Sequence, residues 1–225
     1  MKKTIDEHAE RFDEKADDYD EERPPEYRAC ANLVVEHADP RPEDVVLDLG
    51  AGTGAIGLAL APDCARVVGR DVSEGMLAQA REKADERGLS NVDFAEGSFR
   101  EPAIDGYRHP GGEGSAVDVV VSNFAMHHLD DAGKVEAIDV IANLAPRRFV
   151  LGDVMLFDGV PEDPAYDPTV DDPSTVGHLV DTMTDHWAVT AVERVYDEIG
   201  VLVAEDPAGV GPATGSDRNG SDGGT

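Results

Sequence analysis

Residues 46–54 read Val46-Leu47-Asp48-Leu49-Gly50-Ala51-Gly52-Thr53-Gly54, which is typical of a buried β-strand that runs directly into a glycine-rich turn. A short helix is expected to follow, over residues 55–60. The three glycines let the backbone turn tightly and let a ligand approach it closely. Backbone amides at the start of the following helix would then face a polar ligand. The segment therefore predicts a ligand-binding turn at the end of the first strand.

The pattern D-x-G-x-G-x-G over residues 48–54 resembles the first motif of class I methyltransferases that depend on S-adenosylmethionine. This cofactor carries an ammonium and a sulfonium group, so an acid beside the turn has a positively charged partner. Residues 52–57 also fit G-x-G-x-x-G, and Asp71 follows 19 residues after Gly52, as in dinucleotide-binding proteins. Asp48 argues against that alternative, because strands of a parallel sheet are normally apolar and the acid would repel a pyrophosphate.

The chain has 225 residues, a length that fits one α/β domain. Its two cysteines, Cys30 and Cys64, have no metal-ligand spacing and are expected to be small buried residues, so no metal site is predicted. The first residues lack the apolar stretch of a secretory signal, and no apolar run approaches the ~20 residues that span a bilayer. The sequence therefore predicts a soluble, cytoplasmic protein with no membrane partner.

The chain is strongly acidic, since 19 Lys and Arg residues against 48 Asp and Glu residues give a formal net charge of −29. Such a surface repels itself at low salt and is screened at high salt. The composition is typical of a protein from a cell with a salt-rich cytoplasm, and an ordinary acidic protein is the alternative. Because phosphates are bound by cations, the charge argues against nucleic acid as a partner.

Apolar periodicity, capping residues and turn signals predict seven strands with helices between them. The strands are expected over residues 45–49, 66–71, 92–95, 117–122, 149–156, 189–195 and 199–204. Helices are expected over residues 6–22, 26–38, 55–60, 131–144 and 175–186, with one more between the cap Ser73 and Gly88. Irregular loops are expected over residues 100–116 and 157–173.

Strands that alternate with helices and then pair at the end predict an α/β fold. The expected architecture is a doubly wound, mostly parallel seven-stranded sheet with an antiparallel C-terminal hairpin, similar to the Rossmann-like fold of class I methyltransferases. Residues 1–206 are expected to form one methyltransferase domain, with residues 1–40 as an N-terminal helical lid. Residues 207–225 are rich in Gly, Ser and Asp and are expected to be disordered.

Ligands of doubly wound sheets bind beyond the carboxyl ends of the strands, so candidate site residues are sought there. The resemblance implies that Asp71, at the end of the second strand, binds the ribose hydroxyls, with a helix-capping acid as the alternative. Val72 and Met76 would pack on the adenine ring, although Met76 is equally expected in a helix core. The first turn would hold the methionine part of the cofactor through Asp48, Gly50, Ala51 and Gly52.

The third strand is followed by Gly97, Ser98 and Phe99. In the family, an acid usually follows the glycine and binds the adenine amino group. Here Ser98 takes that place, and its hydroxyl can still accept a hydrogen bond while the amide of Phe99 donates one. These three residues are therefore expected to bind the adenine end of the cofactor.

The fourth strand runs into Ser122-Asn123-Phe124-Ala125-Met126-His127-His128-Leu129, which resembles methyltransferases that act on small molecules, such as those of ubiquinone and menaquinone biosynthesis. Asn123 is expected to line the cofactor near its methionine end. His127, or else His128, is a candidate general base because histidine titrates near neutrality, and a packed or capping histidine is the alternative. In relatives the N-terminal helix covers the site, so Tyr19 is expected either to contact the cofactor or to pack within its helix.

The sequence thus predicts an S-adenosylmethionine-dependent methyltransferase that acts on a small-molecule acceptor, as a monomer or homodimer. Two alternatives remain open at this point. The protein could bind S-adenosylmethionine or a nucleotide without catalysis, or it could be an NAD-dependent oxidoreductase.

Overall fold

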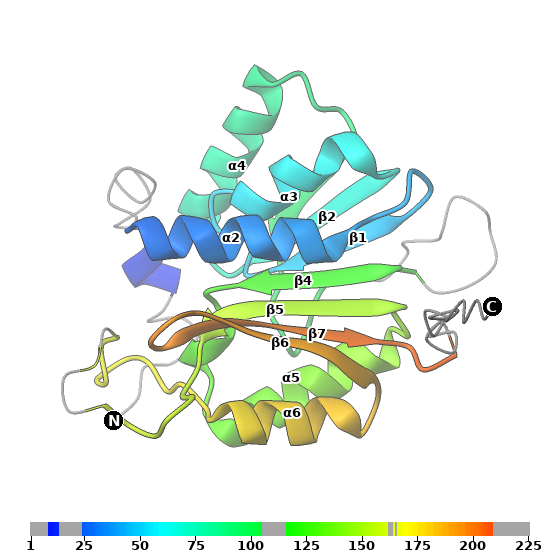
Figure 1. Cartoon of the computed structure of the whole chain (residues 1–225). Coiled ribbons are helices and arrows are strands. Elements are labelled where there is room, and N and C mark those ends of the chain that lie inside the picture. Colours follow the sequence, from blue (N-terminus) through cyan, green and yellow to red (C-terminus); the bar gives the residue numbers. More distant parts are fainter. Residues whose placement is uncertain (1–8, 14–23, 105–115, 162–163, 165, 209–225) are drawn as a thin grey trace, which may run out of the picture.

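The computed structural model describes residues 9–13, 24–104, 116–161, 164 and 166–208. Its centre is one seven-stranded sheet in the order β3-β2-β1-β4-β5-β7-β6 (Figure 1). The strands are β1 Val45–Leu49, β2 Arg66–Asp71, β3 Val92–Glu96, β4 Val119–Asn123, β5 Arg148–Val154, β6 Ala188–Tyr196 and β7 Ile199–Glu205.

Strand β1 pairs in parallel with β2 and β4, and the pairs β2–β3 and β4–β5 are parallel as well. Strand β7 lies antiparallel between β5 and β6. The predicted fold class, a doubly wound sheet that ends in an antiparallel hairpin, is therefore confirmed. The direction of winding changes between β1 and β4, so the carboxyl ends of these two strands lie side by side where ligands of such sheets bind.

Helices cover both faces of the sheet (Figure 1). Helices α2, α3 and α4 lie on one face, and α5 and α6 lie on the other. Their bounds are α2 Pro25–Ala38, α3 Ala55–Leu60, α4 Glu74–Glu86, α5 Asp131–Asn143 and α6 Val176–Thr184, and short 3₁₀ turns are η2 Ala61–Asp63 and η3 Met126–His128.

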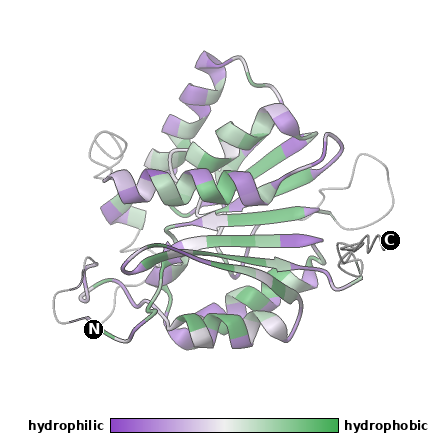
Figure 2. Cartoon of the chain, viewed as in Figure 1, coloured by the Kyte–Doolittle hydropathy of each residue, from purple (hydrophilic) through white to green (hydrophobic). Residues whose placement is uncertain are grey.

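Strand β1 is buried along its whole length, and its residues alternate between the two faces. Leu47 packs with Ile138 of α5 on one face, and Val46 packs with Ile56 of α3 on the other. The same alternation places Asp48 on the face of α3. Figure 2 shows the hydrophobic residues gathered along the central strands, with hydrophilic residues on much of α4. Both faces of the sheet near the switch point are therefore covered.

Two strand boundaries differ from the sequence-based prediction by two residues, and the others differ by one residue at most. Strand β4 begins at Val119, two residues later than predicted, and β5 ends at Val154, two residues earlier. The apolar run continues to Leu156, but the backbone amide of Leu156 donates to the carbonyl of Ser174 (2.9 Å) instead of to a strand of the sheet. Hydrophobicity alone therefore overestimates the length of β5.

The predicted cap of α4 is confirmed, because Ser73 Oγ accepts a hydrogen bond from the amide of Met76 (3.1 Å). Of the N-terminal helix predicted over residues 6–22, residues 9–13 are described and are helical. Tyr19, most of the loop predicted at 100–116 and the tail beyond residue 208 lie outside the described residues. Within the described part of the chain, every helix is too short or too polar to cross a membrane.

Candidate functional site

The glycine turn after β1 has the backbone geometry that only glycine adopts readily. Gly50 and Gly52 have φ angles of +72° and +52°. A Cβ on Gly50 would lie 2.2 Å from Cβ of Ala125, so this glycine lets the turn approach the end of β4. A Cβ on Gly52 would meet nothing within 4 Å among the described residues. The backbone at Gly52 is therefore the open edge of the turn, where a ligand can approach it.

The turn is also tied to β2. The amides of Gly50 and Ala51 both donate to the carbonyl of Arg70, at 2.8 and 3.0 Å. Ala51 itself is buried. These bonds hold the turn over the carboxyl end of β2 and leave its outer edge facing away from the core.

Asp48 lies beneath this turn and is only 1% exposed. Its Oδ2 accepts a hydrogen bond from the amide of Gly57 in α3 (2.9 Å), while its buried Oδ1 has no hydrogen-bond partner among the described residues. Burial raises the pKa of Asp48 to about 7, although the Gly57 amide acts in the opposite direction. A positively charged group placed near Oδ1 would therefore stabilise the ionised form.

Asp71, at the end of β2, joins the glycine turn to the start of α4. Its Oδ2 accepts a hydrogen bond from the amide of Gly52 (2.7 Å), and its Oδ1 accepts one from the amide of Ser73 (2.9 Å). Burial raises the pKa of Asp71, and these backbone donors oppose the shift. The side chain is half-buried, so it combines the capping role with a surface that a ligand can reach.

The residues predicted for the adenine end lie around the ends of β2 and β3. Val72 is half-buried, whereas Met76 is 1% exposed and packs inside the protein. Ser98 Oγ accepts a hydrogen bond from the amide of Glu101 (3.1 Å), so the serine already shapes the turn that follows β3. Gly97 and Phe99 are half-buried beside it. Val72, Gly97, Ser98 and Phe99 are accessible to a ligand, whereas the burial of Met76 favours its alternative role in the core of α4.

Asn123 closes β4 and is half-buried; its Oδ1 lies 3.5 Å from Sγ of Cys30. The next residue, Phe124, has a positive φ of +54°, which is uncommon for a bulky side chain. Its ring stacks on that of Tyr27 in α2, with ring centres 4.0 Å apart. This contact holds the strained turn that carries the chain from β4 into η3.

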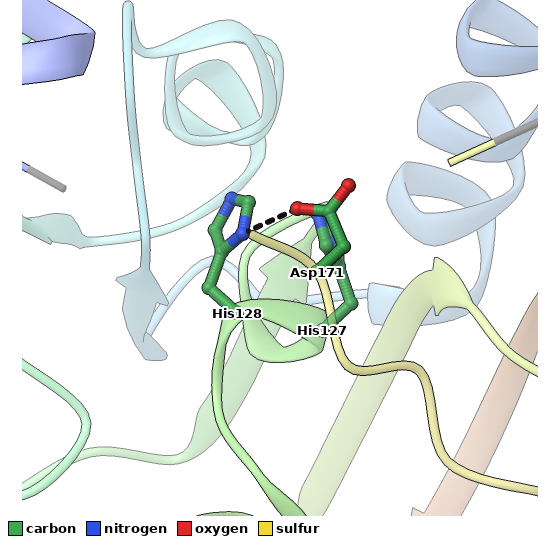
Figure 3. Close-up of side chains that lie close together, drawn as sticks. All are labelled: His127, His128 and Asp171. Atoms are coloured by element: carbon green, nitrogen blue, oxygen red, sulfur yellow. Dashed lines mark ion pairs between the residues drawn. The ribbon is translucent and has the colours of Figure 1, made fainter. Parts of the chain in front are cut away.

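Two histidines and two acids converge just after β4. His127 is 6% exposed, and its Nδ1 lies 2.5 Å from Oδ1 of Asp153 in β5. Its Nε2 lies 3.7 Å from Oδ1 of Asp171, and the same oxygen lies 3.0 Å from Nδ1 of His128. Figure 3 shows the side chains of His127 and His128 beside that of Asp171. We call these three residues the His–Asp cluster.

The charges of the cluster support one another. Burial acts to lower the pKa of His127, but the charge and hydrogen bond of Asp153, together with the charge of Asp171, outweigh it and raise the pKa. Burial acts to raise the pKa of Asp171, but the hydrogen bond from His128 and the charge of His127 outweigh it and lower the pKa. Asp153 and Asp171 therefore stabilise a positive charge on the imidazole of His127.

Two segments far apart in the sequence, residues 9–13 and 166–173, lie against the site. The amide of Asp172 donates to the carbonyl of His127 (2.7 Å), which ties residues 166–173 to η3. On the other side, the ring of Phe12 lies 5.3 Å from that of His128. Asp13 Oδ1 accepts a hydrogen bond from Ser73 Oγ (2.5 Å) at the start of α4. Residues 9–13 thus span from the adenine side to the His–Asp cluster, as a lid would; the lid itself remains a prediction.

Sequence reasoning missed Asp153 and Asp171. Asp153 sits near the carboxyl end of β5, so the rule that locates sites at strand ends could have found it. Asp171 lies in an acid-rich loop and carries no local signal that separates it from its neighbours.

Comparisons with known proteins agree with this geometry. Residues 46–146 match the family model described as a methyltransferase domain. The uncharacterized methyltransferase YcgJ of Bacillus subtilis is 30% identical over 178 residues, which are 74% of this chain and 63% of YcgJ. Its crystal structure superposes with a TM-score of 0.57 at 25% identity, covering 73% of this chain and 71% of that one. Residues 46–146 therefore form a methyltransferase domain. The chain spans less than two thirds of the length of YcgJ.

The match to a methyltransferase domain decides against the dinucleotide alternative. Magnesium protoporphyrin IX methyltransferase from Synechocystis, solved with bound S-adenosylmethionine, has the same fold, with a TM-score of 0.58 at 20% identity over 80% of this chain and 77% of that one. The 23S rRNA (uracil(1939)-C(5))-methyltransferase RlmD of Klebsiella pneumoniae is 35% identical over 124 residues, 52% of this chain and 25% of RlmD. The relatives therefore include enzymes named for a small molecule and for RNA.

The residues present fit the cofactor. The open backbone at Gly52 leaves room for a ligand, and the partnerless buried oxygen of Asp48 suits a ligand with positive charge. Asp71 lies at the end of β2 and accepts a hydrogen bond from the amide of Gly52. These features lie at the switch point between β1 and β4, where the fold predicts a ligand.

Proposed function

We propose that the protein transfers a methyl group from S-adenosylmethionine to a small-molecule acceptor bound beside the His–Asp cluster. The acceptor's nucleophilic atom forms a bond to the methyl carbon, the carbon–sulfur bond breaks, and its electron pair stays on sulfur in S-adenosylhomocysteine. The acceptor's proton passes to Nε2 of His127, whose Nδ1 is held by Asp153. Positioning of the two reactants supplies most of the rate.

Cofactor contacts are proposed at the carboxyl ends of β1, β2, β3 and β4. Asp48 and the turn at Gly50, Ala51 and Gly52 would hold the methionine part, and Asp71 would bind the ribose. Asn123 would lie near the methionine end, and Tyr19 remains a proposed lid contact. The adenine end would rest among Val72, Gly97, Ser98 and Phe99.

The observation that carries the small-molecule assignment is the covered, acidic setting of the His–Asp cluster. Asp171 is 10% exposed in its side chain, and residues 9–13 and 166–173 lie over the cluster. A polynucleotide would have to bring its phosphates against a chain with net charge −29. A small acceptor can enter the same space without that repulsion.

Transfer of label from methyl-labelled S-adenosylmethionine tests this assignment. The purified protein is incubated with an extract of its source cells that has been separated into small-molecule, RNA and protein fractions. Label is expected in the small-molecule fraction with the wild-type protein and is expected to be lost with Asp71→Ala. Label confined to RNA would overturn the small-molecule assignment, and no label in any fraction would favour a binding protein without catalysis.

We also propose that the acidity is an adaptation to high salt. Lowering the ionic strength lengthens the screening distance from about 8 Å at physiological salt to about 30 Å at 0.01 M, so repulsion among the acids then reaches across the domain. The melting temperature is expected to rise from low salt to molar potassium chloride, and S-adenosylhomocysteine should stabilise the protein further because it binds the folded form. A melting temperature that stays flat or falls would contradict the adaptation.

A further inference from the structure

The His–Asp cluster has the spacing of a metal site. One nitrogen of each histidine and one carboxylate oxygen of Asp171 all lie within 4.8 Å of one another. The oxygen is 3.0 Å from Nδ1 of His128 and 3.7 Å from Nε2 of His127. Ligands about 2.0–2.1 Å from a tetrahedral Zn²⁺ are themselves about 3.3 Å apart, which lies between these two distances. Small movements would therefore bring all three atoms to a single ion.

Asp153 supplies the support that histidine ligands of metals usually have. Its Oδ1 accepts from Nδ1 of His127, which directs Nε2 toward Asp171. Asp153 is itself fixed, because it is 2% exposed and accepts hydrogen bonds from the amides of His127 (3.0 Å) and Val154 (2.8 Å). A carboxylate behind a ligating imidazole sets its tautomer and strengthens it as a ligand.

The backbone holds the ligands together before any ion binds. His127 and His128 are neighbours in η3, and the amide of Asp172 donates to the carbonyl of His127. The amide of Asp171 donates to the carbonyl of Asp167 (2.8 Å), which shapes the loop that presents the carboxylate. Lys134 Nζ donates hydrogen bonds to the carbonyls of Leu129 and Asp172, the residues that directly follow His128 and Asp171.

From this geometry we infer that His127, His128 and Asp171 form a binding site for a divalent transition-metal ion such as Zn²⁺. Two imidazoles and one carboxylate are the ligand types that Zn²⁺, Co²⁺ and Ni²⁺ accept, whereas Mg²⁺ and Ca²⁺ prefer oxygen ligands alone. Three protein ligands leave a further position for water or for an oxygen of the methyl acceptor. Asp153 acts behind the site as a positioning residue.

The role of the ion rests on the proposed function, but its binding does not. The site lies beside the cofactor turn, because Ala125, two residues before His127, is the residue that Gly50 approaches. An acceptor hydroxyl bound to the ion would lose its proton more readily. In the loaded protein the ion would thus lower the pKa of the acceptor hydroxyl, and the proton would pass to solvent water instead of to His127.

Titration of the full chain, first treated with a chelator, with Zn²⁺ and Co²⁺ tests the site without cofactor or acceptor. Calorimetry is expected to give one equivalent of bound Zn²⁺, and Co²⁺ is expected to develop visible absorption bands of a low-coordinate site. Asp171→Asn and His128→Ala should abolish this binding. Asp153→Asn should lower the affinity by about 10- to 100-fold. His186→Ala, which removes an exposed histidine paired with Asp139, is the matched control and should leave the binding unchanged.

Binding of S-adenosylhomocysteine by each variant serves as the check that it is folded. Zn²⁺ binding that survives in folded Asp171→Asn or His128→Ala protein would overturn the inference, as would wild-type binding no tighter than that of a variant carrying both substitutions. Failure of the methyl-transfer assay with intact metal binding would instead count against the proposed function alone.

Discussion

Asp48→Asn is expected to stabilise the cofactor-free protein at neutral pH and to weaken its binding of S-adenosylmethionine. The folded-state pKa of Asp48 is raised to about 7 from an ordinary value of 3.8, mainly by burial. At a pH between these two pKa values, Asp48 has lost its proton in the unfolded chain but keeps it in the folded protein. The wild-type protein therefore loses stability as the pH rises through that window, and the loss is complete above the folded-state pKa. Asparagine keeps the shape and the bond to Gly57 but carries no charge.

The gain is expected to be about 2–4 kcal/mol in the free energy of unfolding above neutral pH, with little gain near pH 4. Urea unfolding of both proteins across this pH range measures it. Asp44→Asn is the matched control, because Asp44 is also buried but forms an ion pair with Arg147, so its loss should destabilise the protein. If the stability of Asp48→Asn has the same pH dependence as that of the wild type, ionisation of the buried Asp48 does not destabilise the folded protein, and the prediction is wrong.

The effect of the same variant on the cofactor should have the opposite sign. The ionised Asp48 is unfavourable in the empty fold, and a ligand that brings positive charge near Oδ1 offsets that cost. Calorimetry with S-adenosylmethionine should show weaker binding by Asp48→Asn. Equal affinity of the two proteins would remove Asp48 from the proposed cofactor contacts.

Asp71→Ala is expected to weaken binding of S-adenosylhomocysteine by about 1.5–3 kcal/mol, the scale of hydrogen bonds to a charged acceptor. The structure adds a second reason, because the carboxylate also accepts from the amides of Gly52 and Ser73 and so shapes the turn that the ligand would contact. The fold should persist, since Asp71 lies at a strand end and is half-buried.

Calorimetry at high salt, with circular dichroism to confirm folding, measures the loss. Thr175→Ala is the control: it removes the cap of α6, on the opposite face of the sheet from α3 and α4, and should lower stability by about 0.5–2 kcal/mol while leaving the affinity close to wild type. If a folded Asp71→Ala protein binds S-adenosylhomocysteine as tightly as the wild type, the acid has no part in the site.

Local sequence patterns determined the architecture of this protein. The apolar run that ends in Asp48 and enters the glycine turn, the capping serine at position 73 and the alternation of strands with helices each reflect interactions within a few residues. Such interactions depend little on the rest of the chain. They were enough to place all seven strands within about two residues, to give the doubly wound fold and to point to the cofactor.

Only the tertiary structure decided what surrounds the two histidines. Asp153 and Asp171 lie 26 and 44 residues from His127, and no periodicity links an acid-rich loop to a turn so far away in sequence. Their meeting depends on how β5 pairs beside β4 and on how residues 166–173 lie over η3. Side-chain partners across loops are set by packing of the whole domain, and the sequence therefore suggested a lone base where the fold assembles a cluster with the spacing of metal ligands.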